Sequence, residues 1–229
     1  MRPMHPLDNP TWHALGHRQA AFAERNDLAR RYRPGISVFA AIEHPTAEAW
    51  AALADLVGPG CDLFVNRLGP VEPPGGWTVL GAGLGEQMIL ESEPAAAVNG
   101  AIRELTDDDV DAMVALVALT EPGPFRRGTI ELGGYRGIVE DGQLVAMAGQ
   151  RVGLDDHTEI SAVCTHPDAR RRGLAASVTA AVARGIQAEG RIPILHVAEH
   201  NVSAKRVYEQ LGFTVRTQLT FSAVRTPIA

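Results

Sequence analysis

The chain has 229 residues, a formal net charge of −6 and 45% hydrophobic residues, so it can form one large or two small packed domains. The acidic balance argues against general nucleic-acid binding, and no apolar run reaches the ~18 residues of a membrane span. No signal-peptide-like apolar region follows Met1, and Cys61 and Cys164 lie too far apart to indicate a disulfide scaffold or a zinc site. We expect a soluble cytoplasmic protein that binds neither nucleic acid nor membrane.

Residues 1–95 alternate helix and strand signals, which predicts an N-terminal α/β domain. These signals are the spacing of apolar residues and three residues typical of helix ends: Pro10 and Thr46 at helix starts, and Gly58 at a helix end. The predicted elements are, in order, a helix that places Trp12, Leu15 and Phe22 on one face, a strand over 36–42, a helix between Thr46 and Gly58, and strands over 63–65, 77–80 and 87–90.

Residues 92–97 read as a linker, and a second domain is expected over 98–229. A capping box at Thr106 and Asp109 starts one helix, and Asp141-Gly142 suits a type I′ hairpin turn. The predicted elements are, in order, a short strand at Ile102, a helix from Thr106, a loop over 120–134, a hairpin over 135–152, a strand over 159–165, a helix over 174–188, a strand over 194–198, a helix over 201–211, and one or two strands over 213–224. This order predicts a mixed α+β sheet.

Residues 170–173 are three arginines followed by Gly173, between a predicted strand and a predicted helix. The first N–H groups of a helix lack intrahelical partners and carry the positive end of its dipole. Gly173 has no Cβ to keep a phosphate at a distance, and arginine pairs well with a diphosphate. The turn therefore predicts a site for a phosphorylated ligand.

Two other patterns are rejected as sites. Residues 81–85 resemble a dinucleotide-binding loop, but Glu86 stands where its last glycine belongs and no amphipathic helix follows. His13 and His17 lie one helical turn apart but have no evident third ligand, so no metal site is expected.

The arginine-glycine turn and a second signature about 30 residues later together resemble the GNAT superfamily of N-acetyltransferases. The second signature runs from Leu195 to Phe213 and includes Asn201, Tyr208 and a Leu-Gly-Phe ending. Residues 122–124, 131–133 and 195–197 further resemble the glycyl-N-acyltransferase-like branch. The resemblance covers about 98–226 and implies a GNAT fold there; the α/β alternation of 1–95 permits a degenerate second copy.

The resemblance implies an acyl-CoA co-substrate such as acetyl-CoA, bound without a metal between the strands over 159–165 and 194–198. The pantetheine arm would pair with the first strand, and main-chain N–H groups after it would hold the diphosphate. Tyr208 would protonate the leaving thiolate. The implied binding residues are Val163, Cys164, Thr165, Arg170, Arg171, Arg172, Gly173, Leu174, Ala175, Ala176, Asn201 and Tyr208.

The acceptor amine must lose a proton before it attacks, because at a lysine-like pKa of ~10.4 only about one molecule in 10³ is neutral at pH 7. Two candidate bases are Glu159, at a position where family members often carry a glutamate, and His196, which stands where several carry an acid. A third alternative is that neither acts as the base.

The acceptor itself is expected to be a small molecule or a peptide, and its contacts are sought in the loop over 120–134. By position alone, these are Phe125, Arg126, Arg127 and Glu131. The alternative function is a non-catalytic acyl-CoA-binding module, and a further alternative gives the N-terminal half a role in dimerisation only. Monomer and homodimer remain open.

Overall fold

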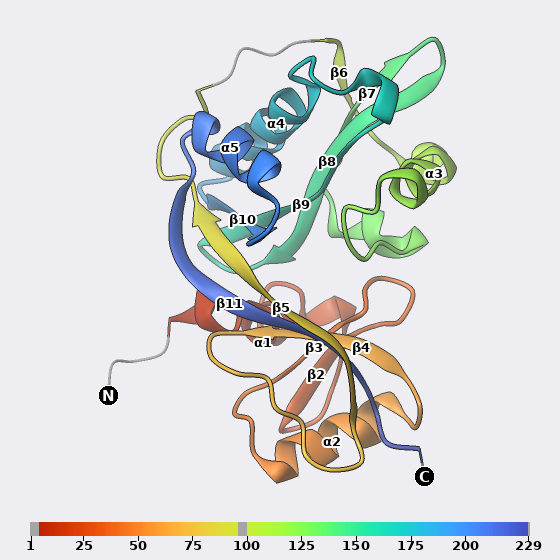
Figure 1. Ribbon diagram of the computed structural model, residues 1–229, viewed down its shortest axis with the longest axis vertical. Helices are drawn as coiled ribbons and strands as arrows, with labels where there is room; N and C mark the ends of the chain where they lie inside the picture. Colours follow the sequence, from red (N-terminus) through yellow and green to blue (C-terminus); the bar gives the residue numbers. More distant parts are fainter. Residues whose placement is uncertain (1–4, 96–99, 229) are drawn as a thin grey trace.

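The computed structural model describes residues 5–95 and 100–228, whose strands form one mixed sheet (Figure 1). The mixed α/β class predicted from the sequence is confirmed. In sheet order the strands are β1 (Ala23–Arg25), β2 (Ala29–Tyr32), β3 (Phe39–Ile42), β4 (Asp62–Arg67), β11 (Thr214–Arg225), β5 (Thr78–Ile89), β10 (Ile192–Ala198), β9 (His157–Thr165), β8 (Gln143–Gly153), β7 (Arg136–Glu140) and β6 (Ile102–Glu104).

Helices cover both faces of this sheet. They are α1 (Pro10–Gly16), α2 (Ala47–Val57), α3 (Val110–Thr120), α4 (Leu174–Ala188) and α5 (Val202–Leu211). The main core joins α4 and α5 to β8, β9 and β10, and a separate cluster joins α3 to β7, β8 and β9. In the N-terminal half, α2 packs Trp50 and Leu53 against β2, β3 and β4.

The two halves of the chain exchange strands. β5 comes from the N-terminal half but lies between β10 and β11, while β11 comes from the C-terminal end and pairs with β4 over 220–225. The long β5–β11 pair therefore runs from one lobe to the other (Figure 1). The sheet is continuous, so the two halves share one framework. The predicted linker over 92–97 and the boundary at 98 lie partly outside the described residues.

The glycine-rich run over 81–85 is part of a strand, and the prediction of two separate strands around it is wrong. β5 is continuous from Thr78 to Ile89. Phe221 of β11 lies opposite Gly83, and a Cβ on Gly85 would come within 2.8 Å of the Phe221 ring. The missing side chain at Gly85 therefore lets an aromatic ring approach the strand closely.

Among the other predicted elements, a hairpin and a long helix are confirmed, and the end of one helix is wrong. The 141–142 hairpin is confirmed, with φ of 50° at Asp141 and 79° at Gly142, and α4 spans 174–188 as predicted. The helix expected to reach Phe22 is wrong, because α1 ends at Gly16 and Phe22 lies in a separate 3₁₀ turn. The strands β1 and β2, which are rich in charged residues, were not predicted.

Candidate active site

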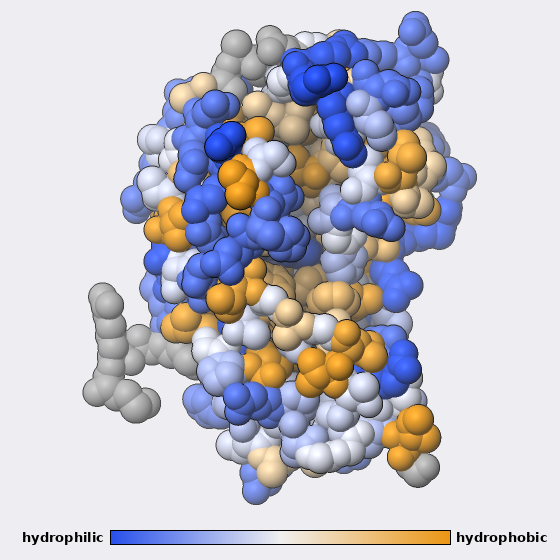
Figure 2. Space-filling view, in the orientation of Figure 1, coloured by the Kyte–Doolittle hydropathy of each residue, from blue (hydrophilic) through white to orange (hydrophobic). Residues whose placement is uncertain are grey.

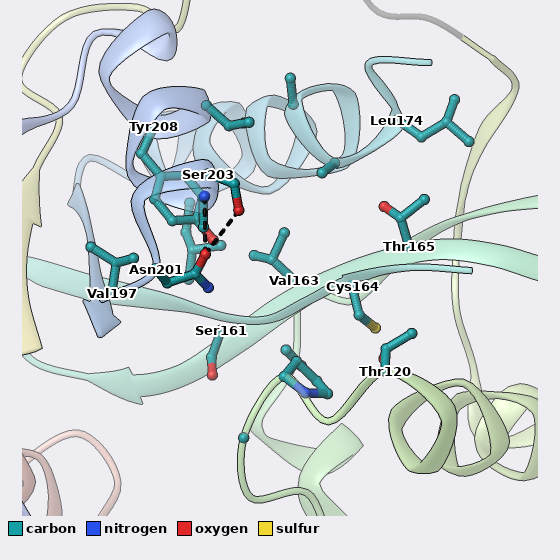
Figure 3. A pocket seen from close by; sticks show the side chains of 18 of the residues that line it. Thr120, Ser161, Val163, Cys164, Thr165, Leu174, Val197, Asn201, Ser203 and Tyr208 are labelled. Carbon is teal, nitrogen blue, oxygen red and sulfur yellow. Dashed lines mark hydrogen bonds between the residues drawn. The ribbon is translucent and has the colours of Figure 1, made fainter. Parts of the chain in front are cut away.

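A cleft opens where β9 and β10 separate. Their parallel pairing ends at Ile160 and Leu195, although β9 continues to Thr165 and β10 to Ala198. The cleft between the diverging strands has a volume of about 720 Å³ and reaches the N-terminus of α4 and the inner side of α5 (Figure 3). Such a gap leaves backbone N–H and C=O groups on facing strand edges for a bound extended chain.

A β-bulge shapes the β9 wall of this cleft. Ser161 pairs with Gly149 of β8 and Cys164 pairs with Met147, so the register shifts across Ala162 and Val163. Ala162 has a φ of 52°, in the left-handed region that residues other than glycine seldom adopt. A bulge redirects side chains and backbone groups locally, and bulges are common beside active sites.

The N-terminus of α4 forms one end of the cleft. Its N-cap is Gly173, with a φ of 77°, and no side chain caps the helix. In contrast, the side chains of Thr46 and Asn201 cap α2 and α5. The first N–H groups of α4 are thus open toward the cleft, which is the arrangement that binds phosphate groups.

The three arginines of the turn divide into two groups. Arg170 and Arg171 are exposed and line the cleft. Arg172 does not line it, because its guanidinium donates to both carboxylate oxygens of Glu140 at 2.9 and 2.6 Å. Arg172 therefore ties the turn to the end of β7.

Two polar side chains at α5 face into the cleft, as Figure 3 shows: Asn201 is the N-cap of the helix and Tyr208 lies within it. Asn201 Oδ1 accepts hydrogen bonds from Ala204 N at 3.2 Å and Ser203 Oγ at 3.1 Å, which leaves the Nδ2 amide for a ligand. Tyr208 lies two turns further along the helix and is buried. Burial, with a contribution from Cys164, raises the pKa of Tyr208 to about 12, so its phenol stays protonated and can donate a hydrogen bond.

Two further β9 residues add to this wall. Burial raises the pKa of the Cys164 thiol to about 11, which keeps it protonated and unsuited to act as a nucleophile. The Oγ1 atom of Thr165 is buried without a hydrogen-bond partner within the described residues. A buried polar atom in a cleft is an available ligand contact. Of the predicted cofactor residues, these line the cleft: Val163, Cys164, Thr165, Arg170, Arg171, Gly173, Leu174, Ala175, Ala176, Asn201 and Tyr208.

The two candidate bases contact each other. His196 Nδ1 lies 2.7 Å from Glu159 Oε1, and the Glu159 carboxylate also accepts hydrogen bonds from Nε and Nη2 of Arg151, the former at 2.9 Å. Burial alone would raise the pKa of Glu159, but the charge of Arg151 and the hydrogen bonds from Arg151 and His196 lower it to about 2. Glu159 is therefore an ionised member of a buried ion cluster.

The other ring nitrogen of His196 is also engaged. Gln87 Oε1 accepts from Arg216 Nη1 at 2.8 Å, so the Gln87 amide nitrogen faces Leu7 O and His196 Nε2, both at 3.0 Å. Nε2 must then accept, and Nδ1 carries the proton that it donates to Glu159. Both ring nitrogens of His196 are thus engaged, and Glu159 does not line the cleft.

The acceptor residues predicted from the loop do not line the cleft. Phe125 packs edge-on against Tyr135, with ring centroids 6.0 Å apart, and Arg127 donates to Asp111 at 2.6 Å. Arg126 lines a separate pocket in the N-terminal half, and Glu131 is exposed outside the cleft. Instead, the start of the same loop reaches the cleft, through residues 120–123.

Arg151 and Gln87 are central to the site and were not predicted. Arg151 is one residue of a long apolar strand, and Gln87 comes from the N-terminal half. Their roles depend on the register of β8 with β9 and of β5 with β10. No local sequence pattern reports such pairings.

His13 and His17 have stacked rings with centroids 6.4 Å apart and share a small pocket with His5 and His157. Over 5–95 and 100–228, no group of three or more His, Cys, Asp or Glu residues is arranged to hold a metal ion. Across the same residues, no helix is both long and apolar enough to cross a membrane.

Comparisons with known proteins agree with this geometry. The family model described as FR47-like protein matches residues 135–222. A solved structure from Novosphingobium aromaticivorans, described as belonging to the GNAT family, is 36% identical, with a TM-score of 0.90; the match covers 99% of this chain and 100% of that one.

More distant structures share the fold alone. A GCN5-related N-acetyltransferase from Kribbella flavida is 15% identical with a TM-score of 0.64, and the match covers 96% of each chain. A GCN5-related N-acetyltransferase-like protein from Streptococcus suis is 14% identical with a TM-score of 0.54, covering 93% of each chain. No curated protein matches the sequence.

Proposed function

The chain belongs to the GNAT family of acetyltransferases, and from this premise we propose that it transfers an acetyl group from acetyl-CoA to an amine by direct attack. The observation that supports this most is the uncapped N-terminus of α4 at the end of the cleft between β9 and β10. The main-chain N–H groups after Arg170 hold the diphosphate, aided by Arg170 and Arg171. The pantetheine arm runs along the edge of β9 toward α5.

The fit of acetyl-CoA rests on donors that the cleft leaves unused. The Nδ2 amide of Asn201 and the hydroxyl of Thr165 both lie on its walls, and Gly173 has no side chain to obstruct a phosphate. In the proposed reaction the amine nitrogen bonds to the acetyl carbon while the carbon–sulfur bond breaks. A main-chain N–H of residues 163–165 stabilises the oxyanion, and Tyr208 donates its phenol hydrogen bond to the departing sulfur.

The acceptor's proton leaves through water in this proposal. Glu159, with its pKa lowered to about 2 by its ion cluster, is too weak a base to hold a proton at neutral pH, and His196 uses both ring nitrogens. The geometry thus favours the alternative in which neither residue is the base. Glu159 and His196 are positioning residues that fix β9 against β10 beside the thioester.

The two halves of the chain contribute differently to the cleft. We assign the cofactor cleft to residues 98–229, while 1–95 contributes Gln87 and β5 behind it. The resemblance to the glycyl-N-acyltransferase-like branch stays a prediction, as does the choice between monomer and homodimer.

The proposal is tested by the release of CoA from acetyl-CoA across a panel of amines. We expect amine-dependent release, and we expect Tyr208→Phe to lower kcat about 10- to 10²-fold, the loss of one hydrogen bond to a charged group, with little change in KM for acetyl-CoA. Tight acetyl-CoA binding without transfer to any amine would instead identify a non-catalytic acyl-CoA-binding module. An unchanged kcat in Tyr208→Phe would remove the phenol from the mechanism.

A further inference from the structure

A second cavity, of about 570 Å³, lies between the two halves of the chain and adjoins the cofactor cleft. β3, β4 and β5 of the N-terminal half line it together with β10, β11 and the Pro122–Pro124 turn. Figure 2 shows apolar surface gathered below the middle of this face, where β5 and β11 run in Figure 1. Leu84 of β5, which is 45% exposed, lines this cavity.

Aromatic rings dominate this cavity. Phe39, Phe64 and Phe221 line it and are three of the six phenylalanines in the chain. The Phe39 and Phe64 rings have centroids 5.7 Å apart, and the Phe221 ring meets His196 edge-on at 5.2 Å. Opposite Phe221, Gly83 of β5 contributes no side chain, and a Cβ there would meet open space. The cavity therefore has room for a planar apolar group among aromatic walls.

The two cavities meet at the place where the thioester is proposed to lie. His196, Val197, Ala198 and Arg151 line both of them. Direct attack needs the acceptor and acetyl-CoA together, and CoA would fill the first cleft, so the acceptor needs an entrance of its own. The second cavity supplies that entrance.

The second cavity offers an unpaired negative charge to a cationic acceptor only at the rim of the cavity. Glu199 is exposed and lines the cavity, whereas the Arg151 guanidinium lies 4.5 Å above the Phe39 ring and is paired with Glu159. The side chains of Glu199, Arg151 and His196 and their neighbour His200 are the titratable groups on its wall, and none of them is a deep, unpaired carboxylate. A polycation would have no partner inside.

We infer that the acceptor is an amine carried by an apolar group about the size of a phenyl ring, which lies among Phe39, Phe64 and Phe221 while the amine reaches the thioester beside His196. This inference rests on the proposed function and narrows it to an acceptor class. A flexible polyamine or a free lysine does not match these walls, because its second charge would be buried without a partner.

The first test varies the acceptor at saturating acetyl-CoA. From ethylamine through n-hexylamine we expect kcat/KM to rise about fourfold per methylene, the factor that corresponds to ~0.8 kcal/mol for each buried CH₂, and 2-phenylethylamine to exceed spermidine by at least about 10-fold. A preference for spermidine, or no trend with chain length, overturns the inference but leaves the acetyl transfer standing. If kcat/KM instead rises from acetyl- through butyryl- to hexanoyl-CoA and shows no trend with the length of the amine, the cavity holds the acyl chain. That result also overturns the inference.

The second test removes one of the aromatic rings that line the second cavity. Phe64→Ala is expected to raise KM for 2-phenylethylamine about 10-fold or more while leaving KM for acetyl-CoA within about twofold. Phe125→Ala, the same truncation at a half-buried ring outside the cavity, is the matched control and should change neither. Calorimetric binding of 2-phenylethylamine in the presence of CoA gives a readout without turnover. If no amine is acetylated, the proposed function fails separately; if 2-phenylethylamine binds wild type and Phe64→Ala equally, or binds neither, the inference fails.

Discussion

Ala175→Asp is expected to weaken acetyl-CoA binding about 10³-fold without destabilising the protein. Ala175 is half-buried in the first turn of α4 and lines the cleft, so a carboxylate there would face the diphosphate. At a separation of about 4 Å and an effective dielectric constant near 20, one unit charge opposes another by ~4 kcal/mol. The same carboxylate interacts favourably with the helix dipole, by about 0.3–1 kcal/mol. Calorimetry with acetyl-CoA and urea unfolding measure the two effects.

Ala47→Asp is the matched control for this substitution. Ala47 lies in the first turn of α2, is exposed, and does not line the cleft. The variant should leave acetyl-CoA affinity unchanged and alter stability by a similar small amount. If Ala175→Asp binds acetyl-CoA as tightly as wild type, the diphosphate does not lie at the N-terminus of α4.

Arg151→Met is expected to lower the free energy of unfolding by about 3–5 kcal/mol. The side chains of Arg151 and Glu159 are only 11% and 1% exposed, so the substitution leaves a buried carboxylate whose main partner is lost. The control is Arg225→Met, which removes a two-bond ion pair with Asp62 on the surface, where the side chains are 44% and 53% exposed. Surface pairs contribute about 0–1 kcal/mol, so the control should change little in urea unfolding at pH 7.

The pH dependence of this effect gives an independent check. The pKa of Glu159 is about 2 in the folded protein and ~4.3 in an unfolded chain, so its ion pair stabilises the fold above pH ~4.3 and loses this effect as the pH falls toward 2. Without Arg151, burial raises the pKa of Glu159 instead. The stability gap between wild type and Arg151→Met should therefore narrow as the pH falls from about 4.5. A gap that stays constant or widens over that range contradicts the ionised Glu159 cluster.

The parts of the site that could be predicted depend on local chemistry. Gly173 at the start of a helix, Asn201 as an N-cap and Tyr208 two turns later are encoded within short stretches, and the structure brings all three to one cleft. The capping box at Thr106 and the turn at Asp141 are likewise short-range signals, and both are found.

The parts that could not be predicted depend on strand pairing across the whole chain. The contact between Glu159 and His196 follows from adjacent parallel strands, and Gln87 reaches His196 because β5 of the N-terminal half pairs with β10. The sequence offers Glu159 and His196 as alternative bases, whereas in the structure their side chains contact each other. Phe39, Phe64 and Phe221 converge only because β11 joins both halves of the sheet. Distances along the chain say nothing about such neighbours.

The most direct measurement compares acetyl-CoA with acetylpantetheine by calorimetry on the wild-type protein. Acetylpantetheine keeps the thioester arm and lacks the diphosphate that the N-terminus of α4 and the flanking Arg170 and Arg171 would hold. We expect acetyl-CoA to bind at least about 10²-fold more tightly. Equal affinities, or no heat with acetyl-CoA, would show that this helix end is not where the acyl donor is held.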